Sequence, residues 1–421
     1  MSQSFVIVGD GIAGSSAAET LREERTDADI TVLTDEGEAL YNRILIKEFA
    51  KGKLPEAPIS IHDEDWYAER DIDLQLDTYV TDVRPDAGEV ETHEGETYEF
   101  DKLLLAVGGT PNQLPVDNSD AEGIHHFWTF QDARKINESA SAAEKGVIVG
   151  AGLLGIDLAA VCGAQGVEGK YLMRGDSWWR YALSEEGAEI MHDAMREKGV
   201  EPVFQSGVDR FETDEEGHVT AAIDPDGERY ECDFAGVAIG LDRNTELLEN
   251  LDVEIDGGIV TDEYMQTTHP DVFAAGDITQ FYDVILEERA QNGAWGSAKE
   301  QGSIAAKNML EYGTEEFEWV TSYSITHFDF PFLSFGHPTL GDDHVEQKYS
   351  ENEWRRLALK DGRIVGGVLI GDLAPQSGYK QLMRERVDVS GQEDVLLREE
   401  FSADDIEREG QVEQEAEAVE N

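Results

Sequence analysis

Two glycine-rich turns constrain the fold of this chain more than any other feature, because each lies between an apolar strand-like segment and a segment of small residues. The turns read Gly9-Asp10-Gly11-Ile12-Ala13-Gly14 and Gly150-Ala151-Gly152-Leu153-Leu154-Gly155. In such a GxGxxG turn the first glycine allows a tight bend, the second lets backbone approach a pyrophosphate, and the third lets the helix pack on the strand. The helix N-terminus then offers amide donors to the phosphates. One copy is weak evidence, but two copies in this context predict two dinucleotide sites.

The segments around both turns predict the same order of strand, turn, helix and strand. Around the first turn we expect a strand at 4–8, a helix to about Arg22 and a strand at 30–33. Around the second we expect a strand at 146–149, a helix to about Ala164 and a strand at 170–173. Further buried strands are expected at 102–107, 234–239 and 272–275. Strands that alternate with helices predict an α/β fold with parallel sheets, here as two Rossmann-like domains.

Near Gly313 the residue pattern changes to alternating aromatic and polar residues with hairpin turn patterns. In WRRLALKDGRIVGGVLIGD, Asp361-Gly362 is a type I′ turn pattern between two strand-like flanks. We therefore expect a small α+β domain over 313–398. The acidic run over 399–421 has few apolar residues and is expected to be a solvated tail.

An acid near the end of the second strand of a Rossmann fold binds ribose hydroxyls. Asp35 and Glu36 occupy this place in the first fold. In the second fold the strand ends in Met173 and is followed by Arg174, with Arg180 six residues later. Two cations suit a 2′-phosphate, which favours NADPH over NADH. The alternative is that both arginines are solvated surface charges.

The charge balance is strongly acidic: 91 acidic residues against 33 basic ones give a formal net charge of -58 over 421 residues. Such a chain repels nucleic acid. At about 1 M salt the Debye length falls to about 3 Å, which screens the self-repulsion. We interpret the composition as adaptation to high salt, as in a halophile. The alternative is an ordinary protein with an acidic tail.

Membrane, disulfide and metal sites are not expected. The chain contains no apolar run of the roughly 18 residues that a membrane helix needs, and a strand-like segment opens the chain with no basic leader before it, which predicts a cytoplasmic protein. The two cysteines, Cys162 and Cys232, lie far apart and form no CxxC pattern. Disulfide frameworks, zinc sites and iron–sulfur ligation are therefore not indicated.

The sequence resembles the pyridine nucleotide-disulfide oxidoreductases, which bind two dinucleotides. The resemblance is carried by GDGIAGSSAAETL, YNRILIKEF, LLLAVGGTP, GAGLLGIDLAA, the segment VAIGLDRNTELLENLDVEIDGGIVTDEYMQTTHPDVFAAGDITQF and the helix NGAWGSAKEQGSIAAKNM. YNR and VLIGD resemble the branch of rubredoxin reductases and nitrite reductase flavin modules. The resemblance implies FAD at the first turn and NADH or NADPH at the second. It implies an FAD domain over 1–112 and 241–312, and an NAD(P)H domain over 113–240.

Several single positions acquire roles from the resemblance. Asp277, after Gly276, resembles the aspartate that binds the flavin ribitol, and the helix that starts near Trp295 resembles the one aimed at the flavin pyrimidine. Arg43 resembles the residue at the FAD phosphates. The remaining positions that the resemblance places at a cofactor are Lys47, Val80, Ala106, Gly108 and Gly240.

Departures from the family concern the electron path. The segment from Tyr41 to Phe49 holds no cysteine, so neither disulfide reduction nor sulfenic acid chemistry is available there. Where relatives often carry a lysine near flavin N5, this chain has Glu48 preceded by Lys47, and which of the two faces the flavin is open. The family glutamate of the second turn is Asp157 here, which either positions the nicotinamide amide or caps local packing. We predict Lys47, Glu48 and Asp157 as the catalytic candidates.

The expected activity is transfer of electrons from NAD(P)H through FAD to an acceptor. The preferred acceptor is a rubredoxin-like or ferredoxin-like redox protein, or a partner subunit. Alternatives are an NAD(P)H oxidase, quinone or diaphorase activity, and a redox sensor without turnover. The resemblance also allows a homodimer through residues 313–398.

Overall fold

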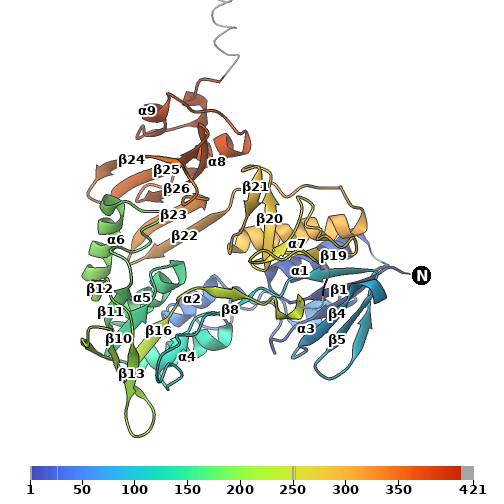
Figure 1. The fold of residues 1–421 in the computed structure, drawn as a ribbon, viewed down its shortest axis with the longest axis horizontal. Coiled ribbons are helices and arrows are strands. Elements are labelled where there is room, and N and C mark those ends of the chain that lie inside the picture. Colours follow the sequence, from blue (N-terminus) through green and yellow to red (C-terminus); the bar gives the residue numbers. More distant parts are fainter. Residues whose placement is uncertain (1, 26, 249–250, 252, 409–421) are drawn as a thin grey trace, which may run out of the picture. The chain divides into compact units, whose positions relative to one another are not determined.

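The structure is a computed structural model that describes residues 2–25, 27–248, 251 and 253–408 (Figure 1). The chain divides into two compact units. The first contains the described residues up to Gln113, then His126–Ser141 and those of Gly240–Trp319. The second contains Leu114–His125, Ala142–Ile239 and the described chain from Val320 onward. The expected division into an FAD, a nucleotide and a C-terminal domain remains a prediction.

The first unit is built on a five-stranded parallel sheet in the order β19-β7-β1-β2-β3. Its strands are β1 (Ser4–Val8), β2 (Asp29–Leu33), β3 (Ile72–Gln75), β7 (Lys102–Leu105) and β19 (Val272–Ala274). The helices α1 (Ile12–Glu24) and α7 (Trp295–Leu310) pack against each other beside this sheet (Figure 1). The core cluster that joins the sheet to these helices includes Phe5, Ile7, Leu104 and Phe273. Burial on both faces explains why β1, β7 and β19 are almost entirely apolar.

Smaller elements complete the first unit. The helices are α2 (Leu45–Ala50), α3 (Glu64–Ala68) and α4 (Phe130–Ala142). Three small sheets are β4-β5-β6 (Val80–Arg84, Glu89–Thr92, Thr97–Glu99), β18-β20-β21 (Ile259–Val260, Thr279–Asp283, Glu288–Ala290) and β8-β17 (Gly109–Pro111, Leu241–Arg243).

The second unit repeats the architecture with a sheet in the order β12-β11-β10-β16-β9. Its strands are β9 (Ile124–His126), β10 (Lys145–Val149), β11 (Glu168–Met173), β12 (Val200–Phe204) and β16 (Phe234–Val237). The helices are α5 (Leu153–Gln165) and α6 (Glu185–Glu197), and a small antiparallel sheet holds β13 (Arg210–Thr213), β14 (Val219–Ile223) and β15 (Arg229–Glu231). The two Rossmann-like folds and the strands expected at 4–8, 30–33, 146–149 and 170–173 are confirmed.

The C-terminal part of the second unit is an antiparallel sheet in the order β22-β23-β26-β25-β24. Its strands are β22 (Ser322–His327), β23 (Phe330–Gly336), β24 (Asp343–Ser350), β25 (Glu353–Lys360) and β26 (Arg363–Ile370), followed by α8 (Gln376–Arg384) and α9 (Glu393–Leu396). Asp361 and Gly362 have φ values of 49° and 74°, as a type I′ turn requires. The predicted hairpin is confirmed.

The expected solvated tail is wrong for residues 399–408. Phe401, Ala403 and Ile406 are buried, and the Phe401 ring stacks on Tyr379 with centroids 4.5 Å apart. Arg355, itself fully buried, donates to the backbone oxygens of Arg398 and Glu399. Three apolar side chains spaced along this acidic segment bury themselves and hold residues 399–408 against the C-terminal sheet. The average composition of the segment does not indicate this packing. Residues 409–421 lie outside the described residues. Among the helices that the structure describes, none is long and apolar enough to cross a membrane.

Candidate functional site

The first glycine-rich turn joins β1 to α1 and has the geometry of a phosphate cradle. Gly9 has φ 106°, and a Cβ added there would lie 2.4 Å from the Ala106 carbonyl oxygen. A Cβ on Gly14 would lie 1.9 Å from the Gly9 oxygen, so neither glycine can be replaced without a shift. A Cβ on Gly11 would meet nothing within 4 Å. Gly11 is also the N-cap of α1 and supplies no side-chain cap, so the first-turn amides, including those of Ile12 and Ala13, suit a phosphate in the open space.

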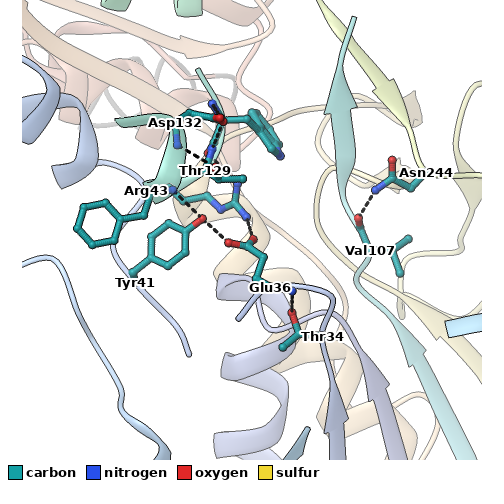
Figure 2. Close-up of polar contacts among 10 residues, drawn as sticks. Thr34, Glu36, Tyr41, Arg43, Val107, Thr129, Asp132 and Asn244 are labelled. Atoms are coloured by element: carbon teal, nitrogen blue, oxygen red, sulfur yellow. Dashed lines mark hydrogen bonds and ion pairs between the residues drawn. The ribbon is translucent and has the colours of Figure 1, made fainter. Parts of the chain in front are cut away.

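Glu36 is the acid that the structure places beyond β2 (Figure 2). Its Oε2 accepts from the Tyr41 hydroxyl at 2.6 Å, and its Oε1 accepts from Arg43 Nη2 at 2.5 Å. Asp35 beside it is exposed. Each carboxylate oxygen has two lone pairs, so Glu36 retains the capacity to accept from ribose hydroxyls. Of the two predicted acids, Glu36 therefore fits the ribose role.

Arg43 is held in place by several groups of the first unit. Besides Glu36, its Nη1 donates to the Trp128 carbonyl oxygen at 2.9 Å. The guanidinium lies 5.4 Å from the Tyr41 ring centroid and 5.2 Å from that of Trp128. Thr129 and Asp132, both labelled in Figure 2, exchange hydrogen bonds between backbone amides and side chains. Asp132 Oδ2 also accepts from the Trp128 amide and so orders the segment that contacts Arg43. The Arg43 side chain is about one quarter exposed, so a cation stays available near the cradle.

Asp277 lies beyond β19, at the edge where the parallel strands end. Its carboxylate accepts no hydrogen bond from the residues that the structure describes, although burial raises its pKa against the lowering effect of Arg43 and Arg243. Arg243 Nε donates to the Asp277 carbonyl oxygen at 2.7 Å, and Gln301 Oε1 accepts from the Gly276 amide at 2.7 Å. Asp277 is only partly exposed, and a partly desolvated carboxylate is stabilised by a hydrogen-bond donor. Asp277 therefore fits the predicted role of binding a polyol hydroxyl.

Asp10, inside the first turn, belongs to a buried polar cluster that sequence reasoning missed. The Tyr67 hydroxyl donates to Asp10 Oδ1 at 2.6 Å and lies 2.9 Å from Ser15 Oγ. Oδ2 has no hydrogen-bond partner among the described residues. Burial raises the pKa of Asp10 from 3.8 to about 7, since it outweighs the hydrogen bond from Tyr67. A turn residue of a fingerprint is ordinarily read as a spacer, so the pattern carried no indication of this cluster.

The other predicted positions of the first unit are placed as follows. Glu48, on α2, pairs with the buried Lys51 at 2.7 Å, whereas Lys47 is half-buried on the same helix. The ion pair between Glu48 and Lys51 was not indicated by the sequence. Val80 begins β4 and is buried, Ala106 follows β7, and Trp295 begins α7. Gly108 has φ 59° and Gly240 has φ 110°, and the Gly240 carbonyl oxygen accepts from the Asn112 amide.

The second glycine-rich turn joins β10 to α5 and repeats the first in detail. Gly150 has φ 116°, and a Cβ there would lie 2.0 Å from the Ala238 oxygen. A Cβ on Gly155 would lie 2.0 Å from the Gly150 oxygen, whereas one on Gly152 would meet nothing within 4 Å. Gly152 is the N-cap of α5 and gives no side-chain cap, so Leu153 and Leu154 open the helix with free amides.

Two tryptophans support the second turn. Trp178 Nε1 donates to the Gly152 oxygen at 3.3 Å, and the Trp179 amide donates to the Ala151 oxygen at 3.3 Å. The Trp178 ring is fully buried and packs edge-on against Phe332 at 5.4 Å. The WW pair was visible in the sequence, but nothing in it indicated that it holds the turn.

Arg174 and Arg180 lie beyond the end of β11 and are exposed. Arg180 packs over Gly175, where an added Cβ would lie 3.0 Å from its Cδ, and it donates to the Tyr181 hydroxyl at 2.7 Å. Within the described residues, neither arginine has a carboxylate within ion-pair distance. Both arginines are therefore exposed cations with no salt bridge in the described part of the chain, although the Tyr181 hydroxyl and, less strongly, Asp176 raise the pKa of Arg180.

Asp157 is fully buried on α5 and contacts the C-terminal sheet. Its Oδ1 lies 2.5 Å from His327 Nε2, and the Tyr323 hydroxyl lies 3.2 Å from both carboxylate oxygens. Sequence reasoning missed both partners. Their spacing of four residues along a strand, which puts both side chains on one face, was the only available indication.

The two cysteine thiols lie in environments that disfavour the thiolate form. Cys162 and Cys232 are free and buried, and burial raises the pKa of each to about 12. Such thiols stay protonated at neutral pH and are poor nucleophiles. In the described part of the chain, no group of three or more histidine, cysteine or acidic side chains is placed to hold a metal ion.

Comparison with known proteins agrees with this geometry. The profile of the pyridine nucleotide-disulphide oxidoreductase family matches residues 3–302, and that of the rubredoxin NAD+ reductase C-terminal domain matches residues 325–387. The ferredoxin–NAD(+) reductase component of the biphenyl dioxygenase system of Paraburkholderia xenovorans is 30% identical to this chain over 313 residues. The aligned region covers 74% of this chain and 75% of that protein. This chain is 29% identical over 308 residues to the corresponding reductase of the 3-phenylpropionate/cinnamic acid dioxygenase of Photorhabdus laumondii, with 73% and 78% covered. The NAD(P)H nitrite reductase of Bacillus subtilis is 24% identical, and the match spans 92% of this chain but only 48% of that protein.

Solved structures share the fold. The putidaredoxin reductase of a covalent complex with putidaredoxin superposes with a TM-score of 0.88 at 24% identity, covering 94% of this chain and 96% of that one. An engineered water-forming NADPH oxidase bound to NADPH superposes with a TM-score of 0.85 at 21% identity, covering 99% of both chains.

Proposed function

This chain belongs to the pyridine nucleotide-disulphide oxidoreductase family, and from that premise we propose that it passes electrons from NADPH through FAD to a small iron–sulfur or rubredoxin-like protein. It is an FAD-dependent NAD(P)H oxidoreductase. Bound FAD supplies two-electron reduction by a nicotinamide and electron release to one-electron carriers, which protein side chains cannot supply. The chain's own part is to bind and orient both nucleotides.

The residues of the first cradle fit FAD. The open space in front of Gly11 and the free amides of α1 suit its pyrophosphate, Glu36 suits the adenosine ribose, and Asp277 suits the ribitol. The positive end of α7 begins at Trp295, beyond Ala294, and favours negative charge near it. Val80, Ala106 and Gly108 remain proposed backbone contacts, and Lys47 and Glu48 remain proposed neighbours of the flavin ring.

One observation carries the proposed electron path: the chain has no thiol with which to receive electrons. The segment 41–49 lacks cysteine, and both cysteines are buried with a pKa raised to about 12. Electrons must then leave for an external acceptor. The two dioxygenase-system proteins compared above are named ferredoxin–NAD(+) reductases. The aligned region covers about three quarters of each protein. Nitrite reduction is not proposed, because the chain spans about half of that relative.

The test is anaerobic reduction followed by reoxidation. The FAD-loaded protein should lose its absorbance near 450 nm on addition of NADPH, and an oxidised [2Fe–2S] ferredoxin or a rubredoxin should restore it much faster than air-saturated buffer does. Reoxidation by dioxygen at the same rate as by every carrier protein would favour an oxidase instead. Reduction without turnover on any acceptor would favour the sensor.

The preference for NADPH rests on Arg174 and Arg180. Both are exposed beyond β11, form no ion pair with a carboxylate in the described part of the chain, and follow Met173 where an NADH-specific fold has an acid. The engineered NADPH oxidase carries two introduced arginines that are also six positions apart, and an aspartate immediately before the first of them was removed. A guanidinium pair binds phosphate with directional, charge-assisted hydrogen bonds.

Replacement of Arg174 by Ala should lower kcat/KM for NADPH by about tenfold or more, because a charge-assisted hydrogen bond contributes about 1.5–3 kcal/mol. The kcat/KM for NADH, which lacks the 2′-phosphate, should change by less than about twofold. Arg180→Ala should behave in the same way. Arg210→Ala is the matched control, since Arg210 is an exposed arginine of the same unit that pairs with Asp209. A wild-type preference for NADH would contradict the assignment.

The acidic surface supports a further part of the proposal, namely that the protein functions at high salt. A net charge of -58 destabilises the compact state through self-repulsion, which salt screens.

A further inference from the structure

The phosphate-binding helix of the second site is braced along its length by the β22–β23 hairpin. At its first turn, Tyr323 Oη lies 3.4 Å from the Leu153 carbonyl oxygen. One turn later, Asp157 Oδ1 lies 2.5 Å from His327 Nε2. The hairpin therefore contacts α5 directly at the end that carries the free amides.

The hairpin also contacts the other end of the helix. A Cβ added to Gly163 would lie 3.3 Å from Cε1 of Phe328, so this glycine allows the hairpin turn to approach closely. Lys198 and Asp329 form an ion pair next to this contact. Contacts at both ends fix the position of the helix more firmly than either contact alone.

Two side chains of the hairpin bind the Asp157 carboxylate. The carboxylate is fully buried and therefore requires partners. Tyr323 lies 3.2 Å from both of its oxygens and shares its one proton between them and Leu153. Burial and the nearby Asp157 charge raise the pKa of Tyr323 well above its usual value, so the phenol remains a donor. His327, also buried, is a further hydrogen-bond partner of this carboxylate.

The N-terminus of α5 needs such support. Gly152 gives it no side-chain cap, which leaves the first turn to be fixed by other groups. Trp178 Nε1 donates to the Gly152 oxygen, and the Tyr323 hydroxyl donates to the Leu153 oxygen. A turn that is already ordered loses less entropy when a ligand binds.

We propose that Asp157, His327 and Tyr323 act as positioning residues that fix the first turn of α5 and so set the affinity of the second site for the pyrophosphate of NAD(P)H. This inference rests on the proposed function. It assigns a role in nucleotide binding to the C-terminal sheet. In this role the Asp157 carboxylate binds side chains of the β22–β23 hairpin.

The test measures binding of NADP+ to the FAD-loaded protein by calorimetry, alongside KM for NADPH. Tyr323→Phe removes only the hydroxyl and should raise Kd about threefold to tenfold, because it removes one hydrogen bond at the helix terminus. KM should rise by the same factor. Asp157→Asn should raise Kd at least as much, and the FAD content per chain should stay unchanged in both variants.

Tyr349→Phe is the matched control. Tyr349 lies on β24 of the same sheet, and its hydroxyl donates to the Leu397 oxygen at 2.6 Å. It should lower thermal stability about as much as Tyr323→Phe but leave Kd within about twofold. Wild-type affinity in both Tyr323→Phe and Asp157→Asn would overturn the positioning role and reduce the cluster to a structural one. A wild-type protein that binds neither NADP+ nor NAD+ would instead overturn the proposed function itself.

Discussion

Asp10 shows how a single side chain can couple the first cradle to pH. The residue is 7% exposed, accepts from Tyr67 and has a second oxygen without a partner among the residues described. Burial raises its pKa from 3.8 to about 7, so the folded state favours the protonated form. Between about pH 4 and pH 7 the folded protein therefore holds a proton that the unfolded chain has lost. Stability contributed by this group falls as pH rises through that window.

Asp10→Asn should therefore stabilise the protein at pH 8 and have little effect near pH 4. A shift of three pKa units corresponds to about 4 kcal/mol at most. Urea unfolding at the two pH values, in the same KCl concentration, measures the difference. Asp120→Asn is the control: Asp120 is exposed, and its replacement should change the free energy of unfolding by less than about 0.5 kcal/mol. An equal effect of Asp10→Asn at both pH values would contradict the raised pKa.

Individual site residues were predictable where a local pattern specifies them. Glu36 follows a strand at a fixed distance from a glycine turn, so the sequence predicted it. His327 and Tyr323 could not be predicted as partners of Asp157, since they lie far along the chain and meet it only through tertiary packing. The same holds for Tyr67 at Asp10.

At the scale of elements, the close packing of α1 on α7 depends on Gly302. A Cβ added to Gly302 would lie 2.0 Å from the Ala13 carbonyl oxygen, in the first turn of α1. That turn carries the amides proposed to bind the FAD pyrophosphate. The two helices come from opposite ends of the first unit's sequence and lie side by side (Figure 1).

Gly302→Ala should destabilise the protein by about 1–3 kcal/mol, the usual cost of overpacking. It should also lower the FAD content, because α1 must move. Gly296→Ala on the same helix is the control: its nearest neighbour would be Trp319 at 3.5 Å, which is ordinary contact. Stability of that variant should be unchanged or raised by up to about 1 kcal/mol. Thermal unfolding and the ratio of flavin to protein absorbance measure both effects.

Elements were predictable where period and turn chemistry agreed. The Rossmann strands are buried apolar runs beside glycine turns, and the Asp361-Gly362 hairpin has both φ values positive, as expected. The docked segment 399–408 was not predictable, because Phe401 and Ile406 bury themselves only through Tyr379 and the rest of the C-terminal sheet.

At the scale of the whole molecule, cations are scarce enough that carboxylates share them. Arg84 lies within ion-pair distance of Asp82, Glu89 and Glu91. Arg196 likewise serves three acids, which are Glu189, Asp193 and Glu201. One positive charge among three negative ones leaves net repulsion at each cluster, and exposed pairs add little stability. Repulsion is thus spread over the folded surface.

Stability should therefore rise steeply with salt. Between 0.1 M and 1 M KCl the Debye length falls from about 10 Å to about 3 Å, and we expect the melting temperature to rise by roughly 10 °C or more. A chain ending at Arg408 separates the two explanations of the charge, because residues 409–421 carry only five of the 91 acidic residues. If charge spread over the folded part is responsible, the shortened chain should keep the same salt dependence. A salt dependence that disappears with those residues would assign it to the terminal run, and full stability of the intact protein in dilute buffer would contradict adaptation to salt.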